Sequence, residues 1–157
     1  MIGLAGRIAG LFRKKRRPGV AFHGAVMVGG RMNSETTLYD KIGGEAAVAA
    51  LVDDLYRRIL ADPDLKRFFE HHALERILSM QRELFCQALG GPLKYSGKPL
   101  STVHYGQGIR MPHFQKFVGH VMAALEKTGL NAQEQSEALA ALAVDADDIV
   151  GRSNVTG

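Results

Sequence analysis

The feature that most constrains the fold is the spacing of the apolar residues from residue 37 onward. In four stretches they recur three and four positions apart, which places them on one face of an α-helix. No stretch alternates apolar and polar residues with the period of two that a half-buried strand requires. The sequence therefore predicts an all-α fold without a sheet. The predicted helices cover residues 45–61, residues 74–89, a stretch from Phe114 that stops at Gly129, and a stretch that begins at Asn131.

Glycine, proline and capping residues mark the ends of these helices. The Asp-Pro pair at 62–63 is expected to close the first helix, because a residue before proline avoids helical dihedral angles. Gly-Gly-Pro at 90–92 ends the second helix. The next segment is rich in glycine and proline and leaves room only for a short helical turn around residues 99–105. Asn131 with Glu134 three residues later resembles a capping box and predicts the start of the last helix.

Length and composition predict one domain core. The chain has 157 residues, of which 46% are hydrophobic, enough for one core and too few for two. No apolar stretch is long enough to span a bilayer. Cys86 is the single cysteine, so neither an internal disulfide nor a cysteine-based metal cluster can form. These features fit the reducing cytosol, and we expect a cytoplasmic location.

Positive charge is concentrated near the N-terminus. Residues 1–34 contain seven of the 20 Lys and Arg residues and none of the 16 Asp and Glu residues. Residues 35–157 are therefore mildly acidic although the whole chain carries a net charge of +4. A basic body would have indicated nucleic-acid binding, so this charge distribution argues against that function.

The chain is predicted to consist of a basic, flexible N-terminal extension, residues 1–34, and a globular domain, residues 35–157. Within the extension, residues 1–17 combine apolar residues at helical spacing with a basic run. That pattern fits weak contact with an anionic membrane surface or with a protein partner. Met32 stands just before the domain, so an alternative is a gene start assigned too far upstream, with Met32 as the true start.

Two polar residues occupy positions where a helix core would place apolar ones. Gln81 lies four residues from both Ile77 and Phe85, on the apolar stripe of its helix. Tyr56 lies at the edge of the stripe of residues 45–61. A buried amide or hydroxyl must find a hydrogen-bond partner or cost about 1–3 kcal/mol. Two alternatives follow. Each residue is a core residue with a local hydrogen-bond partner, or the two residues together direct hydrogen-bond donors into a cavity.

His104 is a third polar residue on an apolar face, which it shares with Leu100 and Val103. A lone histidine in such a place is more often structural than a ligand. Zinc requires three or four protein ligands, whereas haem supplies four nitrogens itself and needs only one axial imidazole. If His104 is a ligand, the sequence favours haem over other metals. His113 and His120 lie seven residues apart and would form at most a weak metal pair.

Three segments of the domain carry motifs that are specific as a set. The segments are LYDKIGGEAAVAALVDDLYRRILADPDLKRFF, MQRELFCQALGGPLKYSG and VHYGQGIRMPHF. Their motifs are Gly43-Gly44 after a short first helix, the Phe68-Phe69 pair, a Leu-Gly-Gly-Pro stop and a histidine before Gly-x-Gly-Ile. Over residues 37–150 the chain closely resembles the truncated haemoglobins of group I. The resemblance implies a two-over-two helical sandwich around a haem, with an extended loop in place of much of the proximal helix.

The resemblance also implies roles for individual residues. His104 matches the proximal ligand of the haem iron, and Tyr56 and Gln81 match distal residues that stabilise dioxygen through hydrogen bonds. The other matched residues contact the haem or the path of the gas: Phe69 wedges the haem, Ile77 occupies a distal position, and Phe85 matches a phenylalanine that gates an apolar tunnel in some members.

By the same resemblance, the cofactor is expected to be a b-type haem whose iron binds dioxygen, nitric oxide and carbon monoxide. The expected function is reversible dioxygen binding and transport. The same haem is also expected to oxidise nitric oxide to nitrate, as a nitric oxide dioxygenase that depends on a separate electron-donating reductase. The alternative is a helical protein-interaction module that binds no haem.

Overall fold

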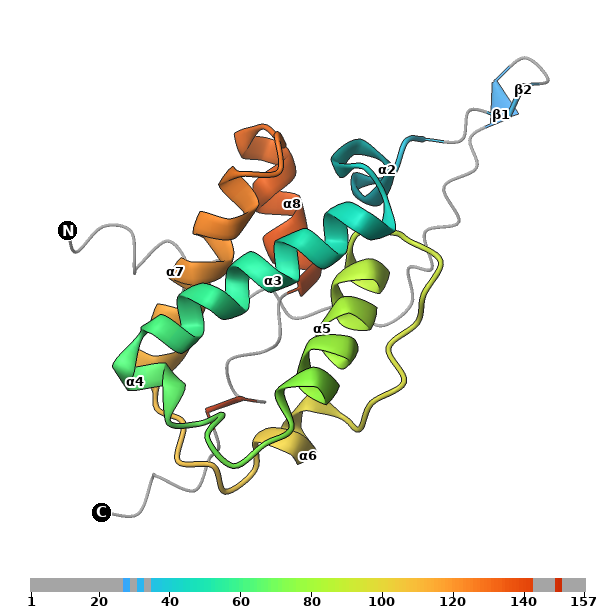
Figure 1. Cartoon of the computed structure of the whole chain (residues 1–157). Helices are drawn as coiled ribbons and strands as arrows, with labels where there is room; N and C mark the ends of the chain where they lie inside the picture. The colour runs from blue at the N-terminus through green and yellow to red at the C-terminus, as the bar shows by residue number, and fades with distance from the viewer. Residues whose placement is uncertain (1–26, 29–30, 33–34, 143–148, 151–157) are drawn as a thin grey trace.

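The structure is a computed structural model of the chain, and it describes residues 27–28, 31–32, 35–142 and 149–150 (Figure 1). Helices dominate the described residues. In chain order the labelled elements are β1 (Met27–Val28), β2 (Arg31–Met32), α2 (Leu38–Ile42), α3 (Glu45–Ala61), α4 (Pro63–Lys66), α5 (Leu74–Ala88), α6 (Leu100–His104), α7 (Met111–Glu126) and α8 (Ala132–Leu142).

Four helices form the body of the protein. Helix α3 packs against α5 and α7, and α8 packs against the same two helices (Figure 1). This closed ring of contacts is the predicted two-over-two sandwich, and it confirms the all-α fold class. The apolar stripe of α3 faces the centre of the ring, so its buried residues are Val48, Leu51, Val52, Leu55, Tyr56 and Ile59.

Local capping interactions fix where several helices begin. The Thr37 hydroxyl accepts a hydrogen bond from the Asp40 N–H at 3.1 Å and so caps α2. At α8 the Asn131 Oδ1 accepts from the Glu134 N–H, and the Asn131 N–H donates to the Glu134 carboxylate, each at 2.9 Å. The predicted capping box is therefore confirmed. Glu134 also pairs with Lys41 at 2.7 Å, which joins α2 to α8.

The Asp62-Pro63 pair closes one helix and begins another, although the sequence predicted only the closure. Asp62 has extended backbone angles, φ −88° and ψ 112°, and its side chain accepts a hydrogen bond from the Asp64 N–H. Pro63 then occupies the first turn of α4, where its missing N–H has no helical partner to lose. The chain bends here because proline is compatible with a helix start and incompatible with a helix interior.

A short two-stranded ribbon lies within residues 1–34, which the sequence predicted as a flexible N-terminal extension. Strands β1 and β2 pair antiparallel, with Met27 opposite Met32 and Val28 opposite Arg31. These two-residue strands precede the helical body and leave the fold class unchanged. Residues 1–17, for which membrane contact was predicted, lie outside the described residues. No helix in the described part of the chain has the length and apolar character needed to cross a membrane.

Candidate functional site

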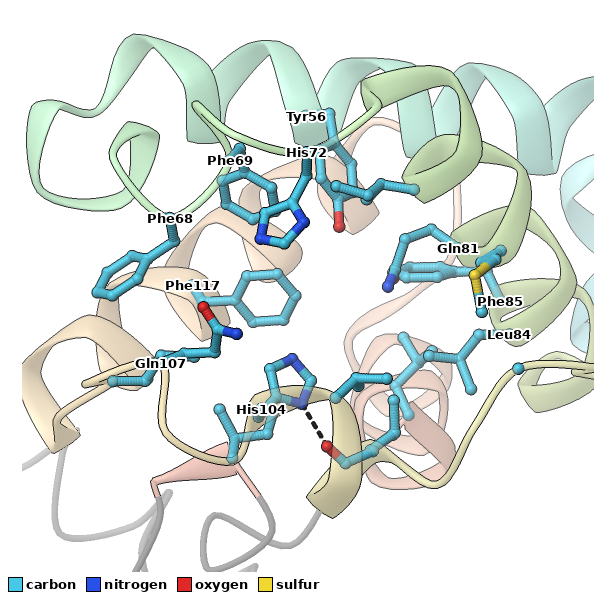
Figure 2. A pocket seen from close by; sticks show the side chains of 18 of the residues that line it. Tyr56, Phe68, Phe69, His72, Gln81, Leu84, Phe85, His104, Gln107 and Phe117 are labelled. Carbon is cyan, nitrogen blue, oxygen red and sulfur yellow. Dashed lines mark hydrogen bonds between the residues drawn. The ribbon is translucent and has the colours of Figure 1, made fainter. Parts of the chain in front are cut away.

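A cavity of about 1010 Å³ opens among α3, α5, α6 and α7. Its walls are mainly apolar and aromatic, with a few polar groups directed inward (Figure 2). All six candidate site residues from the sequence line it: Tyr56, Phe69, Ile77, Gln81, Phe85 and His104. They come from α3, the α4–α5 connection, α5 and α6, so the fold gathers residues almost 50 positions apart into one site.

His104 is the last residue of α6 and is half-buried. Its Nδ1 lies 2.7 Å from the Leu100 carbonyl oxygen. Because a carbonyl oxygen can only accept, Nδ1 carries the proton and donates it to this bond. The other ring nitrogen, Nε2, is then a free lone pair, and Figure 2 shows it directed into the cavity. This orientation through a backbone carbonyl is typical of metal-ligating histidines.

Burial also favours the ligating form of His104. Removal from water lowers the pKa of the imidazole, and the hydrogen bond to the Leu100 carbonyl opposes that shift only in part. The ring therefore stays neutral at physiological pH, and a neutral imidazole is the form that binds metal ions. Val103, which was expected to share a buried face with His104, is instead 38% exposed, although it also lines the cavity.

Tyr56 faces His104 from the opposite wall of the cavity (Figure 2). Only 3% of Tyr56 is exposed, yet its hydroxyl has no hydrogen-bond partner among the described residues. Burial raises the pKa of this hydroxyl far above its ordinary value, so the group remains protonated and can donate. Its orientation is supported by Phe69, whose ring meets the Tyr56 ring edge-on at 5.6 Å.

Gln81 adds a second polar group on the same side as Tyr56. The side chain is half-buried, its amide end points into the cavity in Figure 2, and it too has no hydrogen-bond partner among the described residues. The sequence left open whether Tyr56 and Gln81 were satisfied core residues or donors into a cavity. Both groups are directed into the cavity and lack a local partner, which is the arrangement that the second possibility requires.

Several cavity residues were not identified as site residues from the sequence. Phe117 lines the cavity, but its place on the apolar stripe of α7 made it look like an ordinary core residue. Gln107 also lines it, from the connection after α6, where no periodic pattern applies. His71 and His72 are exposed residues at its edge, and Figure 2 shows His72 beside Phe69. A sequence pattern cannot find such residues because they reach the site through tertiary packing.

Among the residues that the structure describes, the remaining metal-binding side chains do not assemble a second centre. His120 Nε2 lies 3.0 Å from the Asp62 carboxylate, while His113 Nδ1 accepts a hydrogen bond from the Arg110 N–H. Among the described residues no group of three or more His, Cys, Asp and Glu could hold a metal ion. Cys86 is buried and is not among the residues that line the cavity.

Comparison with known proteins agrees with this architecture. The family described as bacterial-like globin matches residues 37–150. The group 1 truncated haemoglobin GlbN of Mycolicibacterium paratuberculosis is 40% identical over 119 residues, covering 76% of this chain and 88% of that protein. The chain is a group I truncated haemoglobin.

Solved truncated haemoglobins share its three-dimensional arrangement. The Fe(III) form of truncated haemoglobin from Tetrahymena pyriformis superposes with a TM-score of 0.68 at 30% identity, covering 74% of this chain and 99% of that chain. Haemoglobin from Chloroflexus aurantiacus superposes with a TM-score of 0.65 at 32% identity, covering 75% and 100%. The truncated haemoglobin described here is thus a haem protein that binds small gases.

The residues present fit a haem. A single imidazole with a free Nε2 supplies the one axial ligand that a porphyrin-bound iron requires of the protein. Phe69, Phe85 and Phe117 provide flat apolar walls within the same cavity. The volume of about 1010 Å³ lies at the upper end of the range for small-molecule pockets, which suits a cofactor as large as a porphyrin.

Proposed function

We propose that this truncated haemoglobin binds dioxygen reversibly at a b-type haem held by His104, and that Tyr56 and Gln81 stabilise the bound gas. The observation that carries the proposal is the opposition of two groups across one cavity. The free Nε2 of His104 points inward from α6, and the unpartnered hydroxyl of Tyr56 points inward from α3 (Figure 2). His104 would hold the iron of a haem bound in this cavity, and Tyr56 would offer it a hydrogen-bond donor from the opposite wall.

Ferrous haem supplies reversible binding of dioxygen and gives the bound ligand partial negative charge. The Tyr56 hydroxyl and the Gln81 amide are donors suited to that charge. Hydrogen bonds to charged groups are stronger than neutral ones, and their strength rises where water is excluded. Tyr56 is almost fully buried, so its donor acts in such an environment. We therefore expect slow release of dioxygen.

We further propose that the protein oxidises nitric oxide to nitrate. In the overall reaction both oxygen atoms of dioxygen would join the nitrogen and the oxygen of nitric oxide in nitrate, and a ferrous haem would supply the one electron that nitrate requires. Repeated turnover then needs an electron donor outside this chain, which we assign to a cytoplasmic reductase. The apolar walls formed by Phe85 and Phe117 favour entry of uncharged diatomic gases over ions.

An optical spectrum of the purified protein tests the binding of haem. We expect a Soret band and histidine-ligated ferric, ferrous and carbonmonoxy spectra, whose ferrous form changes when His104 is replaced by alanine. Family membership favours this outcome over the alternative of a helical interaction module without haem. Absence of a Soret band after reconstitution with haemin, in wild type and in His104→Ala alike, would establish the alternative.

Stopped-flow mixing separates the two activities. The oxygenated protein is mixed with nitric oxide, and conversion to the ferric form is followed together with nitrate yield. Fast formation of one nitrate per haem supports the dioxygenase, provided that a cellular reductase then allows repeated turnover. Slow oxidation, or a ferric product that no reductase fraction restores, leaves dioxygen binding as the function and rules out the enzyme.

A further inference from the structure

Helix α6 carries the proposed iron ligand and yet has little packing of its own. It contains five residues, none of them buried, and its N-cap residue Pro99 offers no side-chain cap. Among the described residues, α6 is absent from the pairs of helices that pack extensively. The position of His104 must therefore depend on the segments that flank α6 rather than on a buried face.

The segment that leads into α6, residues 92–99, is attached to α5, and we call it the strap. Ser96 donates two hydrogen bonds to one carboxylate oxygen of Glu83, from its N–H at 2.9 Å and from its hydroxyl at 2.7 Å. The Tyr95 N–H donates to the Gln87 side-chain oxygen at 2.8 Å. Two successive strap amides are thus held by two side chains one helical turn apart on α5.

The strap also lies in close contact with the surface of α5. A Cβ atom added at Gly97 would stand 2.2 Å from the Met80 Cε and 2.3 Å from the Tyr95 hydroxyl oxygen. The Tyr95 hydroxyl donates to the Lys98 carbonyl at 2.8 Å, which closes the strap on itself. Met80, Glu83 and Gln87 have the spacing of one helix face. The strap is therefore seated along that face.

Glu83 holds the strap as a carboxylate. The hydrogen bonds from Ser96 keep the pKa of the Glu83 carboxyl below its ordinary value, so the group is ionised throughout the neutral range. Hydrogen bonds to an ionised acceptor are stronger than those between neutral groups. Within the described residues Glu83 forms no ion pair, and its carboxylate accepts hydrogen bonds from the strap residue Ser96.

We infer that Glu83, assisted by Gln87, is a positioning residue for His104. The inference rests on the proposed function, in which His104 holds the iron. Ser96 lies four residues before Leu100, and the Leu100 carbonyl orients the His104 ring. Pro99 lies between them, and its fixed φ limits how far the connection can bend. A displacement at Glu83 is therefore transmitted to the imidazole.

The same helix then serves both faces of the haem. Gln81 and Glu83 are two residues apart on α5, which turns them about 200° from one another around the helix axis. Gln81 points into the cavity (Figure 2), while Glu83, which also lines the cavity, anchors the strap through Ser96. Helix α5 thus sets the separation between the distal donors and the proximal ligand.

The test compares Glu83→Ala with Glu83→Gln in the full chain. The glutamine variant keeps a side-chain oxygen that can accept both Ser96 bonds but loses the charge that strengthens them, so its effect is expected to lie between wild type and Glu83→Ala. For Glu83→Ala we expect hydrogen exchange in the strap and α6 to be about tenfold faster in the apoprotein, the change expected if the two lost hydrogen bonds together contribute about 1.4 kcal/mol. In the ferrous haem-loaded protein, the iron–histidine stretching band should shift and broaden in resonance Raman spectra.

Arg82→Ala is the matched control. Arg82 is the neighbour of Glu83 on α5 and pairs with Asp53 at 2.8 Å rather than with the strap. This variant should change neither strap exchange nor the iron–histidine band. Ser96→Ala removes one donor from the other side and should reproduce part of the Glu83→Ala effect.

The possible results separate the inference from the function on which it rests. If wild type shows no iron–histidine band, the proposed ligation by His104 fails, and the inference fails with it. If wild type shows the band, and Glu83→Ala changes neither the band nor strap exchange, only the inference is overturned. Faster strap exchange with an unchanged band overturns it as well, because the strap would then be held by Glu83 without positioning His104.

Discussion

Helices α3 and α6 supply opposite sides of the same cavity and are held in place by different means. Helix α3 has 17 residues, and its buried stripe packs against both α5 and α7. Helix α6 has five residues, none buried. Tyr56, the proposed distal donor, therefore lies on a helix that is fixed by packing. His104, the proposed proximal ligand, lies on a helix that is fixed by a few hydrogen bonds.

Because of this difference, we expect mutations in α3 to affect the stability of the fold and mutations in α6 to affect the coordination of the iron. A change in α3 removes apolar burial and should be felt by the whole fold. A change in α6 removes little burial, so it should alter the environment of the iron while the fold persists. The weakly packed helix is suited to a ligand whose position is adjusted to the cofactor, because small movements there displace few neighbours.

Replacement of His104 is expected to have the largest effect. His104→Ala removes the one imidazole that faces the cavity from α6, so histidine ligation of the iron should be lost. Added imidazole should restore a histidine-like spectrum by filling the vacated space. The urea midpoint of the apoprotein should stay near the wild-type value, which equilibrium unfolding measures. A large fall in that midpoint would mean that α6 contributes to the core, which would contradict the difference between α3 and α6.

Truncation in α3 should instead destabilise the fold. Leu55 is 0% exposed at the centre of the core, and Leu55→Ala is expected to lower the free energy of unfolding by about 2–5 kcal/mol. The matched change in α6, Val103→Ala, should cost less than about 0.5 kcal/mol because that residue is partly exposed. Urea denaturation of both apoproteins checks the pair. Equal losses would remove the distinction between the two helices.

Tyr56 offers a change in α3 that affects the ligand and spares the fold. Tyr56→Phe keeps the buried ring and removes a hydroxyl that has no partner among the described residues. We expect the dioxygen off-rate to rise at least about tenfold, equivalent to about 1.4 kcal/mol, while apoprotein stability changes little. Stopped-flow ligand replacement measures the rate. An unchanged rate would show that Gln81 or another group is the principal donor.

The smallest expected effect concerns the junction where α3 ends. The Asp62 carboxylate caps α4 and accepts a hydrogen bond from His120, and these bonds lower the pKa of its carboxyl. Because the folded-state pKa lies below the unfolded value near 3.9, this stabilisation is present above that value and is lost as the pH falls through the folded-state pKa.

Asp62→Asn tests this electrostatic part while an amide oxygen remains available as a cap. Its urea midpoint should fall below that of wild type at pH 6, and the difference should shrink as the pH is lowered below about 4. A difference that is the same at both pH values would assign the effect to packing instead of charge.

Sequence reasoning succeeded where the determining interactions are local. The bounds of α3 and α5 match the predicted ranges within one residue, because their apolar stripes and terminal Gly and Pro residues lie in the same short segments. The cap at Asn131 is local in the same way. Helix α4 was missed because proline both ends one helix and begins the next, and spacing alone does not separate these roles.

The candidate site divides along the same line. Polar positions on apolar helix faces singled out Tyr56, Gln81 and His104. The resemblance to group I truncated haemoglobins added Phe69, Ile77 and Phe85, and all six line the cavity. Phe117 and Gln107 were missed because one lies on a core stripe and the other in an irregular connection. The hydrogen bonds between the strap and Glu83 join residues 13 positions apart, across a helix end and a loop. Such a contact produces no periodic pattern in the sequence.

The sequence by itself determined the four main helices, the cap at Asn131, the family and the candidate site residues, because each depends on neighbouring residues or on a recognisable motif. Tertiary structure alone decided that the Nε2 of His104 and the hydroxyl of Tyr56 face one cavity, and that α5 anchors the segment leading to α6. Those facts depend on where side chains from distant segments meet. Only packing in three dimensions brings such segments together.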